Sequence, residues 1–134
     1  MAGYSKRSLV EKLGIKADSS VSIVHAPTGY ETVLGPLPGG VITQSKPARG
    51  LDFIQAFFLD SKTLTGEFPA IKKAIKLSGV IWISWPKKAA KLNTDLTENI
   101  VRDIGLKHGL VDVKVCAVDD VWSGLKFMYR ISDR

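Results

Sequence analysis

The sequence predicts an α/β fold, a small three-layer sandwich whose mostly parallel sheet ends in an antiparallel hairpin. Three observations predict it. Continuous apolar runs recur along the chain, and such runs are typical of strands buried on both faces of a sheet. Segments with apolar residues every three or four positions separate these runs, as in amphipathic helices. The last two runs are joined by a connection too short for a parallel crossover.

Length and composition indicate one globular domain spanning residues 1–134. The chain is 45% hydrophobic and 24% charged, which is typical of a folded protein and not of a disordered one. A single cysteine, Cys116, excludes an internal disulfide. No apolar stretch approaches the roughly 20 residues that a membrane-spanning helix needs. We therefore expect a cytoplasmic protein.

The first elements are a short helix and a short strand. Ser8 and Glu11 have the spacing of a capping box, and Gly14 is placed to end the helix that it opens. Residues 21–24 form an apolar run that predicts a strand.

Proline and glycine dominate the segment 27–50, and both residues interrupt helices and strands. The pattern supports only one helical turn at 30–34 and a short strand at 41–43. The remaining structure of this segment cannot be predicted from the sequence.

A buried strand is predicted over 51–59, followed by a helix with one apolar face. Because proline is tolerated only in the first turn of a helix, Pro69 predicts a start near Gly66. The residues of the apolar face recur at helical spacing: Leu64, Phe68, Ile71 and Ile75.

A second buried strand covers 79–85 and is ended by Pro86. Asp95, with Glu98 three residues later, predicts the N-terminal cap of the next helix. Gly109 marks the end of that helix. Its buried face is predicted to consist of Leu96, Ile100 and Ile104.

The last two strands are predicted over 111–118 and 125–131. About six residues separate them, so they form an antiparallel hairpin. Cys116 lies in the first of these strands, and we interpret it as a small buried hydrophobic residue and not as a nucleophile. Trp122, in the turn, is expected to pack against the sheet.

The order of these elements resembles the C-terminal half of the class I S-adenosylmethionine methyltransferase fold, a Rossmann-like sheet that also ends in an antiparallel hairpin. Four short motifs are similar to a bacterial family classified as a domain of unknown function. The resemblance implies a Rossmann-like fold in a bacterial cytoplasmic protein and carries no activity with it. The motifs are Lys12–Lys16, Gly79–Trp82 leading into Pro86 and Lys87, Gly105–Leu110, and Trp122–Gly124.

No motif for a cofactor or metal is present. A nucleotide-binding turn needs several glycines after the first strand, whereas 25–30 has one glycine and Pro27, which lacks an N–H donor. The two histidines and single cysteine show no metal-ligand spacing. We therefore expect no cofactor, including S-adenosylmethionine, and no metal, and we assign no catalytic residue.

One site hypothesis remains. Ligands of open α/β sheets bind beyond the carboxyl ends of the parallel strands. Lysines there could contact an anion, and an aromatic side chain could stack on a ring. The formal net charge of +6 also favours anionic partners. The candidate ligand-binding residues are His25, Tyr30, Lys62, Trp85, Lys87 and Lys88.

The sequence thus favours a non-enzymatic Rossmann-like domain that binds a small anionic ligand. The first alternative is a divergent or degenerate methyltransferase-like enzyme. The second is a nucleic-acid-binding accessory protein, which would require Lys72, Lys73 and Lys76 to join other basic residues on one face. The oligomeric state and the identity of the ligand or partner are not predictable from the sequence.

Overall fold

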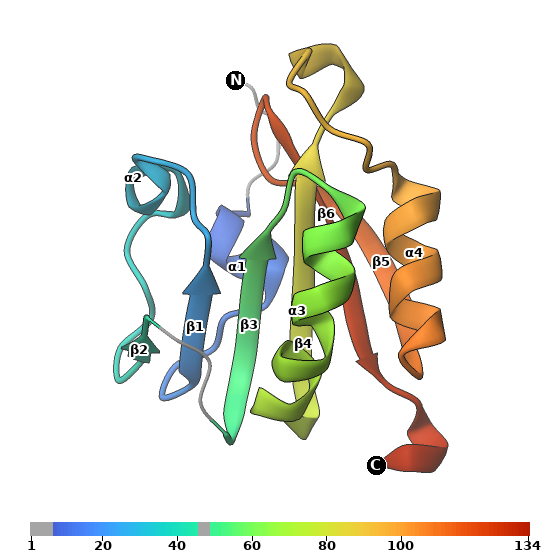
Figure 1. The fold of residues 1–134 in the computed structure, drawn as a ribbon. Coiled ribbons are helices and arrows are strands. Elements are labelled where there is room, and N and C mark those ends of the chain that lie inside the picture. Colours follow the sequence, from blue (N-terminus) through green and yellow to red (C-terminus); the bar gives the residue numbers. More distant parts are fainter. Residues whose placement is uncertain (1–6, 46–48) are drawn as a thin grey trace.

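The structure, a computed structural model, describes residues 7–45 and 49–134, which form one six-stranded sheet in the order β2-β1-β3-β4-β6-β5 (Figure 1). Within these residues, β6 is the one strand that runs in the direction opposite to the other five, and it lies between β4 and β5. The strands are β1 Ser20–Val24, β2 Ile42–Gln44, β3 Leu51–Phe57, β4 Ile75–Pro86, β5 Leu110–Ala117 and β6 Trp122–Tyr129.

Helices cover both faces of the sheet, which confirms the three-layer sandwich. α3 (Ser61–Ala74) and α4 (Glu98–Lys107) lie on one face, and α1 (Leu9–Leu13) and α2 (Tyr30–Leu34) pack into the core of the other (Figure 1). Two short 3-10 helices complete the chain: η1 Lys88–Ala90 after β4 and η2 Ile131–Asp133 at the end. No helix among the described residues is long and apolar enough to cross a membrane.

The predicted hairpin is confirmed, but its last strand takes the inner position. β6 carries Leu125 and Phe127, both fully buried, whereas Val113 and Val115 on β5 are nearly half exposed. The strand with the more deeply buried side chains lies inside the sheet, and β5 forms the edge. The interpretation of Cys116 as buried is therefore wrong, because on this edge strand it is half-buried.

The start of α3 differs from the prediction. The helix begins at Ser61, not near Gly66, because the Asp60 carboxylate accepts a hydrogen bond from the Thr63 N–H at 2.8 Å and caps it. Pro69 therefore lies inside the helix, on its exposed side. Because proline has no N–H, the carbonyl of Thr65 lacks its helical donor, and water can reach it there. Leu64, Phe68 and Ile71 form the buried face as predicted, and Ile75 already belongs to β4.

The N-terminal cap of α4 is Thr97 and not Asp95: its hydroxyl accepts from the Ile100 N–H at 3.2 Å. Asp95 instead accepts hydrogen bonds from the Ser61 backbone and hydroxyl, both at 2.8 Å, and these bonds lower its pKa. Consequently α4 begins later than predicted. Its buried residues are Val101, Ile104 and Gly105, whereas the predicted Ile100 is exposed.

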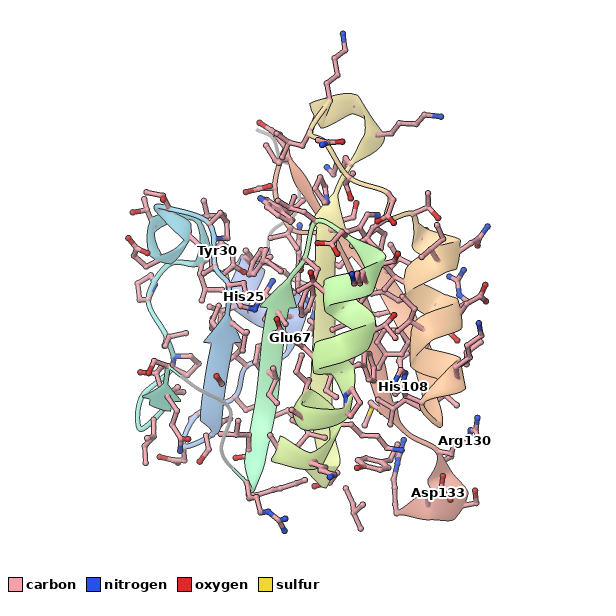
Figure 2. All side chains as sticks on the ribbon, viewed as in Figure 1. His25, Tyr30, Glu67, His108, Arg130 and Asp133 are labelled. Atoms are coloured by element: carbon pink, nitrogen blue, oxygen red, sulfur yellow. The ribbon has the colours of Figure 1, made fainter. Side chains whose placement is uncertain are left out.

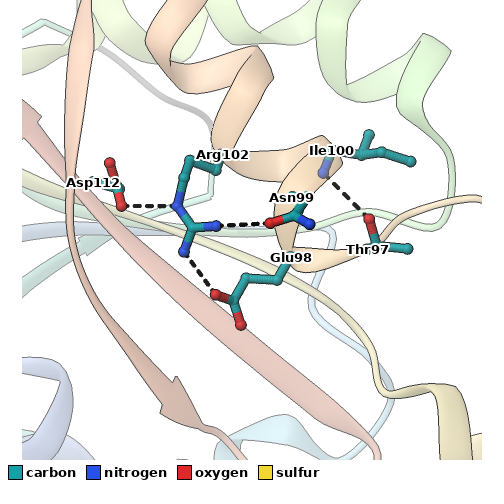
Figure 3. A network of polar contacts seen from close by, with 6 residues as sticks. All are labelled: Thr97, Glu98, Asn99, Ile100, Arg102 and Asp112. Carbon is teal, nitrogen blue, oxygen red and sulfur yellow. Dashed lines mark hydrogen bonds and ion pairs between the residues drawn. The ribbon is translucent and has the colours of Figure 1, made fainter.

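A polar network holds α4 against the edge strand (Figure 3). The Arg102 guanidinium donates to Asp112 of β5 at 2.9 Å, to Glu98 at 2.6 Å and to Asn99 at 3.0 Å. One arginine thus connects the first turn of the helix to β5. Because the guanidinium can still reach water, we assign this network a positioning role and only a modest contribution to stability.

Candidate functional site

The sheet has one topological switch point, between β1 and β3. From β1 the chain turns outward to β2, and from β3 it continues to the other side through α3 to β4. The two connections leave on opposite faces, so their loops diverge and open a crevice, which is where open α/β sheets bind ligands. A cleft of about 430 Å³ lies here, lined by residues of both loops, of α3 and of the start of β6.

Aromatic side chains form the floor of this switch-point cleft. Phe57 packs edge-on against Trp122 with ring centroids 5.1 Å apart, and Phe58 meets the His25 ring at 5.5 Å. Phe57 and Phe58 are almost fully buried, and Trp122 is 9% exposed. The floor is therefore rigid, and the small exposed parts of these rings have little conformational freedom left to lose on binding.

A histidine–carboxylate pair forms the rim. His25 Nε2 and Glu67 Oε1 are 2.8 Å apart, one residue from the loop after β1 and the other from α3 (Figure 2). Their side chains are 51% and 39% exposed, so solvent and a ligand can reach both. His25 has a backbone φ of +57°, a left-handed conformation that is uncommon outside glycine and that turns its ring toward α3.

The carboxylate at the start of α3 is fully used. Asp60 accepts from the Thr63 N–H at 2.8 Å and from the Thr63 hydroxyl at 2.9 Å. Both carboxylate oxygens are therefore engaged in capping the helix. This leaves the His25–Glu67 pair as the most available polar group of the cleft.

A buried polar chain supports the floor from below. The Tyr30 hydroxyl donates to Gln55 Oε1 at 2.6 Å, and Gln55 Nε2 donates to the Ser84 hydroxyl at 3.3 Å. Burial raises the pKa of Tyr30, so the phenol stays protonated and keeps its role as donor. The Tyr30 ring also packs on Phe57 at 4.8 Å, which ties the loop after β1 to the aromatic floor.

The six residues predicted as a site do not gather in one place. His25 lines the switch-point cleft, whereas Tyr30 is buried beneath it and Lys62 is exposed on the first turn of α3. Trp85 and Lys88 line a different hollow, of about 390 Å³, beside the start of α4. Lys87 is half-buried, and its backbone N–H donates to the Val121 carbonyl at 2.7 Å.

Sequence reasoning missed the partners of His25 in the cleft. Glu67 lies 42 residues away on a helix whose start was misplaced, and nothing in its spacing distinguishes it from a solvated glutamate. Phe57 belonged to a strand predicted as core, and Trp122 was assigned a purely structural role. Only the position of the strand ends could have suggested this combination.

The loop after β1 does not fit S-adenosylmethionine, the cofactor that the fold implies. Pro27 has no N–H, and its carbonyl accepts from the Tyr30 N–H within a tight turn. The following helix, α2, has five residues and no side-chain capping bond. Tyr30 and Phe57 fill the space below the loop. These residues do not form the glycine-lined backbone cradle of a Rossmann cofactor turn. Within the described residues, no cluster of histidine, cysteine and carboxylate side chains could hold a metal ion.

Several solved structures with the same fold are methyltransferases. An S-adenosylmethionine-dependent methyltransferase from Aquifex aeolicus superposes with a TM-score of 0.62 at 16% identity, over 91% of this chain and 88% of that one. DhpI in complex with SAH gives 0.64 at 11% identity, over 92% and 83%.

Magnesium protoporphyrin IX methyltransferase from Synechocystis, with bound SAM, gives a TM-score of 0.58 at 10% identity, over 91% of this chain and 74% of that one. No protein-family model matches the sequence, and no curated protein matches it significantly. Identities this low establish shared architecture and nothing about chemistry. The strand order with β6 inserted between β4 and β5, together with these superpositions, shows that the chain has the Rossmann-like fold of S-adenosylmethionine-dependent methyltransferases.

Proposed function

We propose that this protein is a small-molecule-binding domain on a methyltransferase-like fold, and that its switch-point cleft binds a planar, nitrogen-containing ring such as a purine nucleoside. The observation that carries the proposal is the combination, at the switch point, of an aromatic floor with the His25–Glu67 pair. Aromatic faces stack on planar rings, and a carboxylate accepts hydrogen bonds from ring amino groups or ribose hydroxyls.

The residues that line the cleft also indicate the charge of its ligand. No lysine or arginine is among the described residues that line the cleft, and Glu67 and Asp60 both are. A phosphate group would meet carboxylates and a single imidazole there. The cleft therefore favours a neutral or cationic ring, and an anionic ligand beside His25, Lys87 and Lys88 is supported by no shared hollow.

A binding role is favoured over catalysis because the polar groups are already paired. Asp60 and Thr63 cap α3, and Glu67 holds His25. Among the described residues that line the cleft, no hydroxyl or thiol is hydrogen-bonded to the imidazole, as a serine or cysteine nucleophile activated by histidine would be.

The second candidate function is methyl transfer by a divergent enzyme. Its support is the fold together with the acidic and aromatic cleft, which would suit a sulfonium cation. In that case the His25–Glu67 pair would remove a proton from the methyl acceptor. The loop after β1, which lacks a glycine-lined cradle, disfavours this candidate. The calorimetric titration described next separates the two candidate functions.

The test is isothermal titration calorimetry with adenosine, adenosine monophosphate, S-adenosylmethionine and S-adenosylhomocysteine. We expect adenosine to bind more tightly than its monophosphate, and Glu67→Gln to weaken binding about tenfold, the loss of one charge-assisted hydrogen bond. Lys62→Gln, on the same helix but outside the cleft, is the matched control and should change nothing. Failure of all four compounds to bind, or equal binding by wild type and Glu67→Gln, would refute the proposal. Tight binding of S-adenosylmethionine with methyl transfer would select the second candidate.

A further inference from the structure

A second polar feature lies away from the switch-point cleft, on the face of the sheet that α1 and α2 pack against. The core on this face includes Trp82 of β4, whose indole Nε1 donates to the Leu13 carbonyl at 2.8 Å. This bond fixes the end of α1 beside β4. Lys16, three residues further along, is exposed and lines a hollow with Val80 of β4, which also contains Asp18 and Asp52.

Strand register puts two more lysines in the same row. Lys126 of β6 pairs with Trp82 on one side and with Lys114 of β5 on the other. Directly paired residues of adjacent strands project to the same face, with Cβ atoms about 5 Å apart. Lys126 is half-buried and Lys114 is exposed, so the ammonium groups share one border between core and solvent.

These charges repel one another, and none of the three lysines forms a salt bridge within residues 7–45 and 49–134. The positive charges of Lys114 and Lys16 add to partial burial in lowering the pKa of Lys126. Among the described residues, the carboxylates that form ion pairs contact His25, Lys76 or Arg102, and none contacts the three lysines. Like charges directly opposite on a sheet are destabilising. An anion bound between them would remove the repulsion.

We propose that Lys16, Lys114 and Lys126, here called the lysine row, form a binding site for the phosphate group of a small molecule. The site does not depend on the function proposed for the switch-point cleft. The number of charges favours a compact anion, because one cross-strand lysine pair and a single further lysine suit one phosphate or pyrophosphate group. The ammonium groups are point charges that contact phosphate oxygens without a demand for planar geometry.

Nucleic acid fits the observations less well. A polynucleotide requires a longer basic stripe, with phosphates contacted at regular spacing. The lysines of α3 do not extend the row: Lys72 donates to the His108 carbonyl at 2.6 Å, and Lys76 pairs with Asp52 at 2.9 Å. Of the three lysines that a nucleic-acid face would need, two are engaged elsewhere.

The experiment measures thermal unfolding and calorimetric binding of the full chain with inorganic phosphate, pyrophosphate and a twelve-nucleotide RNA. Pyrophosphate should bind wild type most tightly and raise its melting temperature. Lys114→Gln should weaken that binding at least about fivefold, the effect of one partly screened charge. Without anion, the same variant should melt higher than wild type, because one repulsive charge is gone.

Lys73→Gln is the matched control, since it also removes one exposed lysine but lies on α3, outside the lysine row. Lys126→Arg keeps the charge and should retain binding even if a neutral residue at this half-buried position prevents folding. Equal anion stabilisation of wild type, Lys114→Gln and Lys73→Gln would overturn the proposal. Preference for the RNA over pyrophosphate would overturn it in favour of a nucleic-acid surface.

Discussion

Removing one hydroxyl from the buried chain of Tyr30, Gln55 and Ser84 tests whether it supports the switch-point cleft. In Tyr30→Phe the ring still packs on Phe57, but Gln55 Oε1 loses its donor at a position with no solvent exposure. An unsatisfied buried acceptor costs about 1–3 kcal/mol. For a domain of this size, that free energy lowers the melting temperature by about 4–12 °C.

The assay is urea unfolding followed by tryptophan fluorescence, with Tyr129→Phe as the matched control. The Tyr129 hydroxyl donates to the Lys72 carbonyl at 3.2 Å in a half-buried position, where water can replace it. We expect Tyr129→Phe to lower the free energy of unfolding by less than about 1 kcal/mol.

A double-mutant cycle isolates the network. Combining Tyr30→Phe with Gln55→Leu removes both partners of the hydrogen bond, so the double variant should be more stable than the sum of the single losses implies, by about 0.5–3 kcal/mol. If Tyr30→Phe costs no more than Tyr129→Phe, or if the two changes are additive, the network does not stabilise this region and the reasoning fails.

Three further changes have defined outcomes. Trp122→Ala should cost about 3–5 kcal/mol, because the buried indole packs on Phe57; an unchanged urea midpoint would contradict its place in the core. Gly105→Ala should destabilise strongly in thermal melts, since its Cβ would overlap the Phe127 ring, whereas Gly66→Ala, in open space on α3, should stabilise by about 0.5–1 kcal/mol. Similar effects of the two substitutions would show that α4 does not approach the sheet closely. Hydrogen bonds from the Ser20 backbone N–H and from Lys76 lower the pKa of Asp52 below its ordinary value of 3.8. The contribution of these bonds to the stability of the fold is therefore present above pH 3.8 and is lost as the pH falls through the lowered pKa. Asp52→Asn should therefore flatten the acid limb of the stability curve, and an identical acid limb in both proteins would count against the pairing.

Local signals were sufficient wherever neighbouring residues decide the structure. The capping box of Ser8 and Glu11 and the left-handed Gly14 appear as predicted, because both depend on residues within one helical turn. The apolar runs of β3 and β4 and the buried face of α3 were also correct, since periodic burial leaves a periodic sequence.

Competition between local signals was harder to predict. Pro69 alone predicted a start of α3 near Gly66, but Asp60 caps the helix earlier and Pro69 is tolerated inside it because it faces solvent. Asp95 had the spacing of a cap, yet its carboxylate binds Ser61 on another element. Such choices depend on partners far away in the chain, so one segment examined by itself cannot reveal them.

By itself the sequence determined the fold class, the terminal hairpin and the lack of a glycine-rich turn after the first strand, because periodicity and residue chemistry encode them. Only the tertiary structure decided that β6 enters the sheet ahead of β5. It also brought His25 to Glu67 across 42 residues and Lys126 between Trp82 and Lys114. Strand order and register set these contacts, and both depend on the burial of the whole chain and not on any local pattern.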